Sequence, residues 1–235
     1  MVSIGKADVV EPAMRRKLNG IARALIIVGS GSVTILVVAV LQHTGITAVD
    51  EPIRAWLLSV RTPELTVVMI TFAILFGPIV LPAIVLIVAA TWGVVTKQAW
   101  RPLLLAGGML SGVIVSQIIL RLVHRDRPPQ ALMLFGADPS FSFPSGHVLG
   151  ASDFLLITTY LVISRRSAFR GAGISFSVAG LGIVAAAISR LYLGYHWTTD
   201  AAASVALSLV VLGCVIAVDT AHTVPHAHRN PVSGR

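Results

Sequence analysis

The chain alternates between long apolar segments and short polar ones, and most of the apolar segments approach the length that crosses a bilayer as a helix. Such a helix needs about 20 consecutive apolar residues. We predict spans at residues 21–41, 102–122, 144–164, 171–190 and 200–218. The pattern therefore predicts an all-α polytopic membrane protein.

A further apolar segment, 65–95, is longer than one span needs, and Gly77-Pro78 and Pro82 interrupt it. Proline removes a backbone donor and clashes with the preceding turn, so a helix bends or ends there. We expect a kink, or a short helix leading into a tilted second span. This segment brings the prediction to six transmembrane helices in one bundle. The polar connection before it is predicted to form a short surface helix over 50–60.

The two ends of the chain are polar, and the N-terminal end is rich in basic residues. We expect a cytoplasmic segment at 1–20, a six-span membrane domain at 21–218 and a disordered cytoplasmic tail at 219–235. With this orientation, most of the 18 Lys and Arg residues lie in the cytoplasm, as the positive-inside rule requires. The connections after spans one, three and five then face outward, to the periplasm or the extracellular space.

The composition agrees with a cell-membrane protein, because 55% of the residues are hydrophobic and only 12% are charged. A net charge of +8 would suggest nucleic acid as the partner of a soluble protein. Here the basic residues flank the spans, where they contact anionic headgroups, so we expect the bilayer and no nucleic acid. The single cysteine, Cys214, lies inside an apolar run and cannot form an intrachain disulfide. The oligomeric state stays open.

Polar residues gather at the predicted outer ends of spans three to six. They form three stretches: Arg125-Asp126-Arg127-Pro128, then Phe143-Pro144-Ser145-Gly146-His147, then Ser189-Arg190 with His196 and Asp200. Arg127 and Arg190 can each bind phosphate oxygens through a planar fork. Pro144 suits the first position of a helix, where the free N–H groups of the following residues would face an anion.

The two histidines of these stretches have different neighbours. His196 and Asp200 are four residues apart and share one face of a helix that begins near Trp197. A carboxylate behind an imidazole fixes its tautomer and stabilises the positive charge that develops when the other nitrogen attacks. His147 then remains as the proton source for the leaving group. The pattern favours a nucleophile and a separate acid.

Together, the three stretches resemble the signature of the type 2 phosphatidic acid phosphatase superfamily of lipid phosphatases. The resemblance implies that His196 attacks phosphorus to form a phosphohistidine and that Asp200 orients it. It implies that His147 protonates the leaving group and later activates water. It also implies phosphate binding by Arg127, Ser145, Gly146 and Arg190, and a reaction that uses no metal and no cofactor.

One position departs from the family pattern. The first motif of the family has a lysine, six residues, and then Arg-Pro, but position 120 is Leu120. Either Arg121 or Arg125 can supply the missing charge, and Arg121 is favoured. Beyond the two matched arginines, both could meet the extra phosphate of a diphosphate.

Two further groups receive structural interpretations. Asp153 lies inside span four, where an ionisable side chain needs a partner, and we expect a polar contact with a neighbouring span rather than catalysis. The tail residues His222, His226 and His228 look like metal ligands by composition, but no cysteine or carboxylate cluster accompanies them. We predict no metal site.

These features predict a membrane enzyme that hydrolyses a lipid phosphate or diphosphate. The resemblance to small members of the family that recycle polyprenyl carriers implies polyprenyl diphosphate or monophosphate, in cell-wall carrier lipid recycling. Phosphatidic acid or phosphatidylglycerophosphate is the alternative substrate. The alternative from another class is a non-catalytic protein that binds or transports anionic lipids. Such a protein does not need His196 paired with Asp200 and a second histidine.

Overall fold

The computed structural model describes residues 9–164 and 171–225. The helices are α1 (Pro12–Gln42), α2 (Asp50–Ser59), α3 (Pro63–Leu75), α4 (Val80–Thr96), α5 (Trp100–Val123), α6 (Gly146–Ile163), α7 (Ala172–Tyr192) and α8 (Thr198–Ala221). Two short 3₁₀ helices, η1 (Gly45–Val49) and η2 (Gln130–Leu132), and two short strands, β1 (Val9–Val10) and β2 (Val224–Pro225), complete the described elements.

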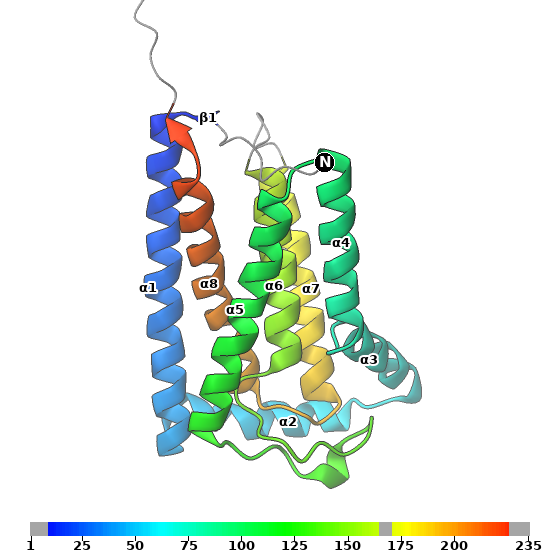
Figure 1. Ribbon diagram of the computed structural model, residues 1–235. Helices are drawn as coiled ribbons and strands as arrows, with labels where there is room; N and C mark the ends of the chain where they lie inside the picture. Colours follow the sequence, from blue (N-terminus) through cyan, green and yellow to red (C-terminus); the bar gives the residue numbers. More distant parts are fainter. Residues whose placement is uncertain (1–8, 165–170, 226–235) are drawn as a thin grey trace, which may run out of the picture.

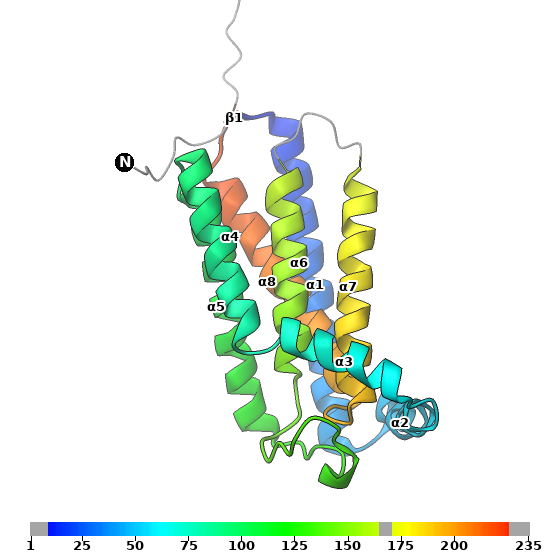
Figure 2. The same cartoon turned by 90° about the vertical axis from the view of Figure 1, so that its right-hand side faces the viewer.

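The membrane bundle consists of α1 and α4–α8, which run side by side, while α2 and α3 lie across one end (Figures 1 and 2). Helix α8 is central and packs against α1, α5 and α6. Gly29 of α1 lies directly against Ala206 and Val210 of α8, because a helix without a side chain at that point can approach closely. Five described helices are each long and apolar enough to span a membrane, and the bent α3–α4 pair meets the same criterion when it is taken as one broken span.

The second crossing is broken where the sequence predicted it. Helices α3 and α4 are bent by 51° relative to each other. The break contains Gly77 and Pro78, and α3 lies obliquely across the bottom of the bundle in Figure 2. The expected short helix leading into the second span is therefore present. The surface helix expected over 50–60 is also present, as α2.

The predicted boundaries need correction at both ends of the chain. Helix α1 begins at Pro12 rather than at residue 21, because Pro12 suits a first helical position and the basic residues after it are good helix formers with long apolar stems. Helix α8 extends to Ala221, and Val224–Pro225 pairs in parallel with Val9–Val10. His222 stacks on Trp100 with ring centroids 3.9 Å apart. The tail beyond 225, with His226 and His228, lies outside the described residues.

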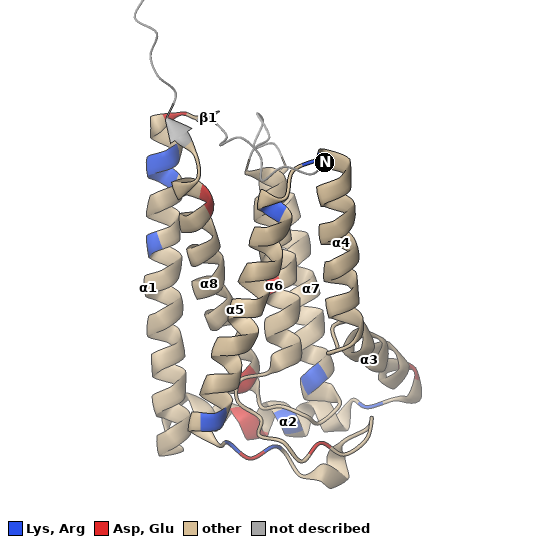
Figure 3. Cartoon of the chain, in the orientation of Figure 1, with Lys and Arg blue, Asp and Glu red and all other residues tan. Residues whose placement is uncertain are grey.

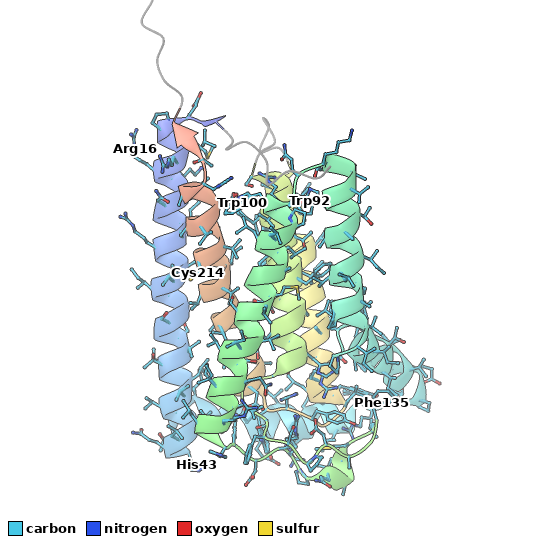
Figure 4. The ribbon with its side chains drawn as sticks, viewed as in Figure 1. Arg16, His43, Trp92, Trp100, Phe135 and Cys214 are labelled. Carbon is cyan, nitrogen blue, oxygen red and sulfur yellow. The ribbon has the colours of Figure 1, made fainter. Side chains whose placement is uncertain are left out.

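The two ends of the bundle differ in what they carry. Strands β1 and β2 lie at one end, and the connections 124–145 and 193–197 lie at the other (Figure 1). Charged residues are concentrated toward these ends (Figure 3). Trp92 and Trp100 lie toward the end with the strands, whereas His43 and Phe135 lie at the opposite end (Figure 4). All three polar stretches therefore lie at the end opposite the described termini.

Asp153 of α6 touches neighbouring spans, as its position suggested. It is 1% exposed and lies close to Ser208 of α8. A Cβ atom added to Gly112 of α5 would lie 3.3 Å from its Cγ. The carboxyl group therefore fills the contact between three helices, away from the site described below.

Candidate active site

The polar stretches converge at the end of the bundle that carries the long connections. Arg127 comes from the connection after α5, His147 from the first turn of α6 and Arg190 from the last turn of α7. His196 lies in the connection before α8, and Asp200 lies in the first turn of α8. The NH1 group of Arg127 lies 3.2 Å from Nε2 of His196. His147 is close enough to Arg190, His196 and Arg127 to interact with all three electrostatically.

The imidazole of His196 is held from behind at Nδ1. This nitrogen lies 2.8 Å from the carbonyl oxygen of Ser142 and 3.4 Å from Oδ2 of Asp200. Because a carbonyl oxygen can only accept, Nδ1 carries the proton and Nε2 keeps its lone pair. Asp200 was predicted from the sequence, but the nearer partner, Ser142, was not. Its contribution is a backbone oxygen, which has no sequence signature.

His196 is neutral near pH 7. Burial lowers its pKa to about 4, the hydrogen bond to Asp200 opposes this effect, and the charges of Arg190 and Arg127 add to it. A neutral imidazole with its lone pair at Nε2 is the form that can attack phosphorus.

Asp200 is fully buried and has three partners. As the third residue of α8, it accepts a hydrogen bond from the backbone N–H of Trp197 at 2.9 Å, which caps the helix. Its other oxygen accepts from NH1 of Arg125 at 2.6 Å. The helix begins at Thr198, close to the predicted start. One carboxylate therefore both caps α8 and contacts the imidazole of His196.

Arg127 is fixed by the connections on either side of the site. It donates to the carbonyl oxygens of Ser140 at 2.9 Å and Tyr195 at 2.8 Å, and its NH2 group pairs with Asp138 at 2.9 Å. These contacts hold the guanidinium beside Nε2 of His196, where it can bind an anion.

Arg190 and Ser145 have donors available for an anion. Arg190 is only 4% exposed, its guanidinium stacks 4.1 Å over the ring of Tyr195, and its Nε has no hydrogen-bond partner among the described residues. The hydroxyl of Ser145 is likewise buried without a partner. Because unsatisfied buried donors are costly, both groups are suited to binding phosphate oxygens.

The start of α6 differs from the prediction. Pro144 does not occupy the first helical position, because the helix begins at Gly146 with Ser145 as an extended N-cap, and the Phe143–Pro144 peptide is cis. The first helical hydrogen bond runs from Leu149 N to Ser145 O. The N–H groups of Gly146, His147 and Val148 therefore remain free at the helix N-terminus, which is still suited to an anion.

His147 lies beside the break in the second crossing. A Cβ atom added to Gly77 would lie 3.7 Å from Nε2 of His147. At the break between α3 and α4, the backbone of Gly77 therefore lies close to the imidazole of His147. The sequence indicated the break and the histidine separately, but not their contact.

The two extra arginines do not lie as expected. The guanidinium of Arg125 is bound by two carboxylates, Asp200 and Asp50, each at 2.6 Å. Arg121 is exposed and lies between Ile119 and Val123, which pack inward on the cluster of Leu36, Val40, Phe143 and Ala203. The guanidinium of Arg125 is therefore occupied by two carboxylates, and Arg121 is an exposed residue of α5. The sequence did not indicate Asp50, which looks like an ordinary acidic residue at the start of a surface helix.

Comparisons with known proteins agree with this arrangement. The PAP2 superfamily model matches residues 101–223. Phosphatidylglycerophosphatase B of Bacillus subtilis (strain 168) is 28% identical over 187 residues, which cover 78% of this chain and 90% of that protein.

A solved structure is similar over most of its length. The crystal structure of the first transmembrane PAP2-type phosphatidylglycerolphosphate phosphatase from Bacillus subtilis has a TM-score of 0.73 and 26% identity. The similarity covers 84% of this chain and 95% of that one. With the six-crossing bundle and the convergence of the three stretches, these matches show that the chain belongs to the PAP2 superfamily and is a multi-pass membrane lipid phosphatase.

Proposed function

We propose that this lipid phosphatase hydrolyses a glycerophospholipid phosphate monoester of the phosphatidylglycerophosphate class through a phosphohistidine at His196. The observation that carries the mechanism is the orientation of the His196 ring. Its Nδ1 is held by Ser142 and Asp200, and its unprotonated Nε2 accepts a hydrogen bond from NH1 of Arg127 at 3.2 Å. An anion bound by Arg127 therefore meets the nucleophile.

The first step forms a bond between Nε2 of His196 and phosphorus while the bond from phosphorus to the ester oxygen breaks. Arg127, Arg190, the Ser145 hydroxyl and the N–H groups at the start of α6 bind the phosphoryl oxygens. His147 donates a proton to the ester oxygen, which leaves as the alcohol of the lipid. Asp200 stabilises the positive charge on the phosphorylated ring.

The second step regenerates the enzyme. Water attacks phosphorus and loses a proton to His147 as the bond from phosphorus to nitrogen breaks. Inorganic phosphate leaves, and His196 returns to its neutral form. The two histidines thus keep separate roles in both steps.

The choice of lipid depends on the extra arginines. Polyprenyl diphosphate was favoured because Arg121 and Arg125 could bind a second phosphate. Arg125 is instead held by Asp50 and Asp200, and Arg121 lies on the exposed face of α5. The similarity to a phosphatidylglycerophosphatase supports a glycerophospholipid. We therefore rank polyprenyl phosphates second.

A substrate panel tests this ranking. We expect kcat/KM for phosphatidylglycerophosphate to exceed that for polyprenyl diphosphate by about tenfold or more, equivalent to at least one charge-assisted hydrogen bond. Phosphate release is measured with purified protein for these lipids, polyprenyl phosphate and phosphatidic acid. Arg121→Ala is the matched variant and should leave every rate unchanged. A preference for polyprenyl diphosphate that disappears in Arg121→Ala would overturn the ranking.

The same panel includes a chelator. In the described ranges 9–164 and 171–225, no group of three or more His, Cys, Asp or Glu side chains is arranged to hold a metal ion. Because arginines supply the positive charge, we expect the rates to persist in the chelator. Activity lost on chelation and restored by magnesium would contradict this expectation.

We further propose that the active site faces the periplasm or extracellular space, with both termini in the cytoplasm. The positive-inside rule supports this orientation. It is tested in a Cys214→Ala background with single cysteines at two exposed positions, Ala137 in the connection before α6 and Gln98 in the turn between α4 and α5. We expect an impermeant thiol reagent to label intact cells at Ala137→Cys but not at Gln98→Cys. The reverse pattern would place the site in the cytoplasm.

A further inference from the structure

Asp50 is a buried carboxylate outside the three stretches and outside the part of the chain that matches the family model. It is the first residue of α2, the helix that lies across the active-site end of the bundle (Figures 1 and 2). It is only 4% exposed. Glu51, the next residue, is 62% exposed in its side chain and pairs with Arg54 of the same helix. Only the first of these two acidic residues is directed into the protein.

The partners of Asp50 are Thr199, at the start of α8, and Arg125, in the connection after α5. One carboxylate oxygen accepts from the backbone N–H of Thr199 at 2.9 Å. The other accepts from the Thr199 hydroxyl at 2.7 Å and from NH2 of Arg125 at 2.6 Å. The NH1 group of the same guanidinium donates to Asp200 at 2.6 Å. A continuous series of contacts thus runs from Asp50 through Arg125 to Asp200 and His196.

The separate N–H donors of the Arg125 guanidinium explain why it has two carboxylate partners. A buried ion is costly unless it is paired and its donors are satisfied. Asp50 pairs with NH2 of the guanidinium and Asp200 with NH1, so the two ion pairs together fix the position of the guanidinium. With Arg125 held in this way, Oδ1 of Asp200 is fixed, and Oδ2 is directed at Trp197 N and His196.

Helix α2 is tied to the same connection at its other end. Just beyond α2, Arg61 donates to the carbonyl oxygen of Tyr192 from Nε at 3.0 Å and from NH2 at 2.6 Å. The backbone N–H of Thr62 donates to the Tyr192 hydroxyl at 2.9 Å. The chain is therefore held on both sides of His196, at Tyr192 by residues just after α2 and at Thr199 by the first residue of α2.

We propose that Asp50 is a positioning residue for the hydrolysis: it does not touch substrate, but through Arg125 it sets the orientation of Asp200 and hence of His196. This role rests on the proposed function of His196 as the nucleophile. Helix α2, which precedes the family motifs in the sequence, then stabilises the arrangement of the active-site residues.

The test compares Asp50→Asn with Glu51→Gln, the same chemical change at the neighbouring residue. We expect Asp50→Asn to lower kcat by about 10- to 100-fold, the usual effect of losing a partner that orients a ligating or reacting group. KM should stay within about twofold of wild type, because no substrate contact is lost. Glu51→Gln should leave both constants unchanged. Rates are expressed per folded protein, measured by size-exclusion chromatography in detergent.

Coupling to Asp200 separates positioning from general stability. If Asp50 acts through Asp200, adding Asp50→Asn to Asp200→Asn should lower kcat by no more than about twofold further. If the loss of kcat in the double variant equals the product of the losses in the two single variants, the proposal is wrong. An unchanged kcat in Asp50→Asn would also overturn it. If Asp50→Asn does not fold, Thr199→Val replaces it, since it removes the hydroxyl that bonds both Asp50 and Arg125.

For Thr199→Val we expect a smaller loss of kcat, about three- to tenfold, with the same lack of additivity. Additive losses would overturn the proposal here too. These outcomes are distinct from a failure of the proposed function. Wild-type activity in His196→Ala would show that His196 is not the nucleophile. Additive losses in the double variant would show only that Asp50 does not act through Asp200.

Discussion

Replacing His196 with alanine is expected to lower kcat for phosphate release by at least about 10⁴-fold, the scale on which enzymes lose activity with their nucleophile. The structure gives the reason. His196 is 4% exposed, its Nδ1 is bonded from behind, and its Nε2 faces Arg127. His147, the second histidine of the site, lies at the start of α6 and has the separate role of proton donor in the proposed mechanism. The measurement is phosphate release from phosphatidylglycerophosphate in detergent micelles.

His124→Ala is the matched control. His124 follows α5 at the same end of the bundle, and its ring packs edge-on against Phe141 at 4.6 Å. Among the described residues, no hydrogen bond or ion pair joins its side chain to the site residues named above, so kcat should stay close to that of wild type. Phosphate release by His196→Ala at the wild-type rate would contradict the mechanism.

The second large effect is expected for Asp200→Asn, a loss of about 10²- to 10⁴-fold in kcat, as when the orienting carboxylate of a triad becomes an amide. An amide cannot accept at both oxygen positions. One of its contacts with Arg125, Trp197 N and His196 must therefore be lost.

The pH dependence gives this variant a second readout. Asp200 raises the pKa of His196, against the burial that lowers it to about 4. Losing the carboxylate therefore lowers this pKa further. A neutral nucleophile is then present at still lower pH, so the acid limb of kcat/KM that reports His196 should move down, not up. Asp126→Asn, at an exposed position nearby, should leave both the rate and the limb in place. An upward shift in Asp200→Asn would contradict the assignment.

The sequence was sufficient to predict the bundle and the convergence of the three stretches. Crossing a bilayer demands about 20 apolar residues, so the spans stand out in the chain. Gly77 and Pro78 interrupt the ladder of helical hydrogen bonds, so the break was visible too. His196 and Asp200 sit at a spacing that allows only a few geometries, so their pairing could be predicted before the structure.

Other parts of the site depend on contacts that the sequence does not encode locally. The carbonyl of Ser142 is a backbone atom, and any residue at that position would present one. Arg125 and Arg127 are two residues apart with the same chemistry, but only packing decides that Arg125 binds carboxylates and Arg127 lies beside His196. Asp50 is separated from Thr199 by most of the chain, and its burial follows from the way α2 crosses the bundle.

The transfer of phosphate to His196 is tested most directly by the stereochemistry at phosphorus. A lipid thiophosphate of defined chirality at phosphorus is hydrolysed in isotopically labelled water, and the configuration of the released thiophosphate is determined. A covalent intermediate requires two in-line displacements, each of which inverts the configuration. The proposed mechanism therefore predicts overall retention, whereas inversion would show that water attacks the lipid directly and that His196 is not the nucleophile.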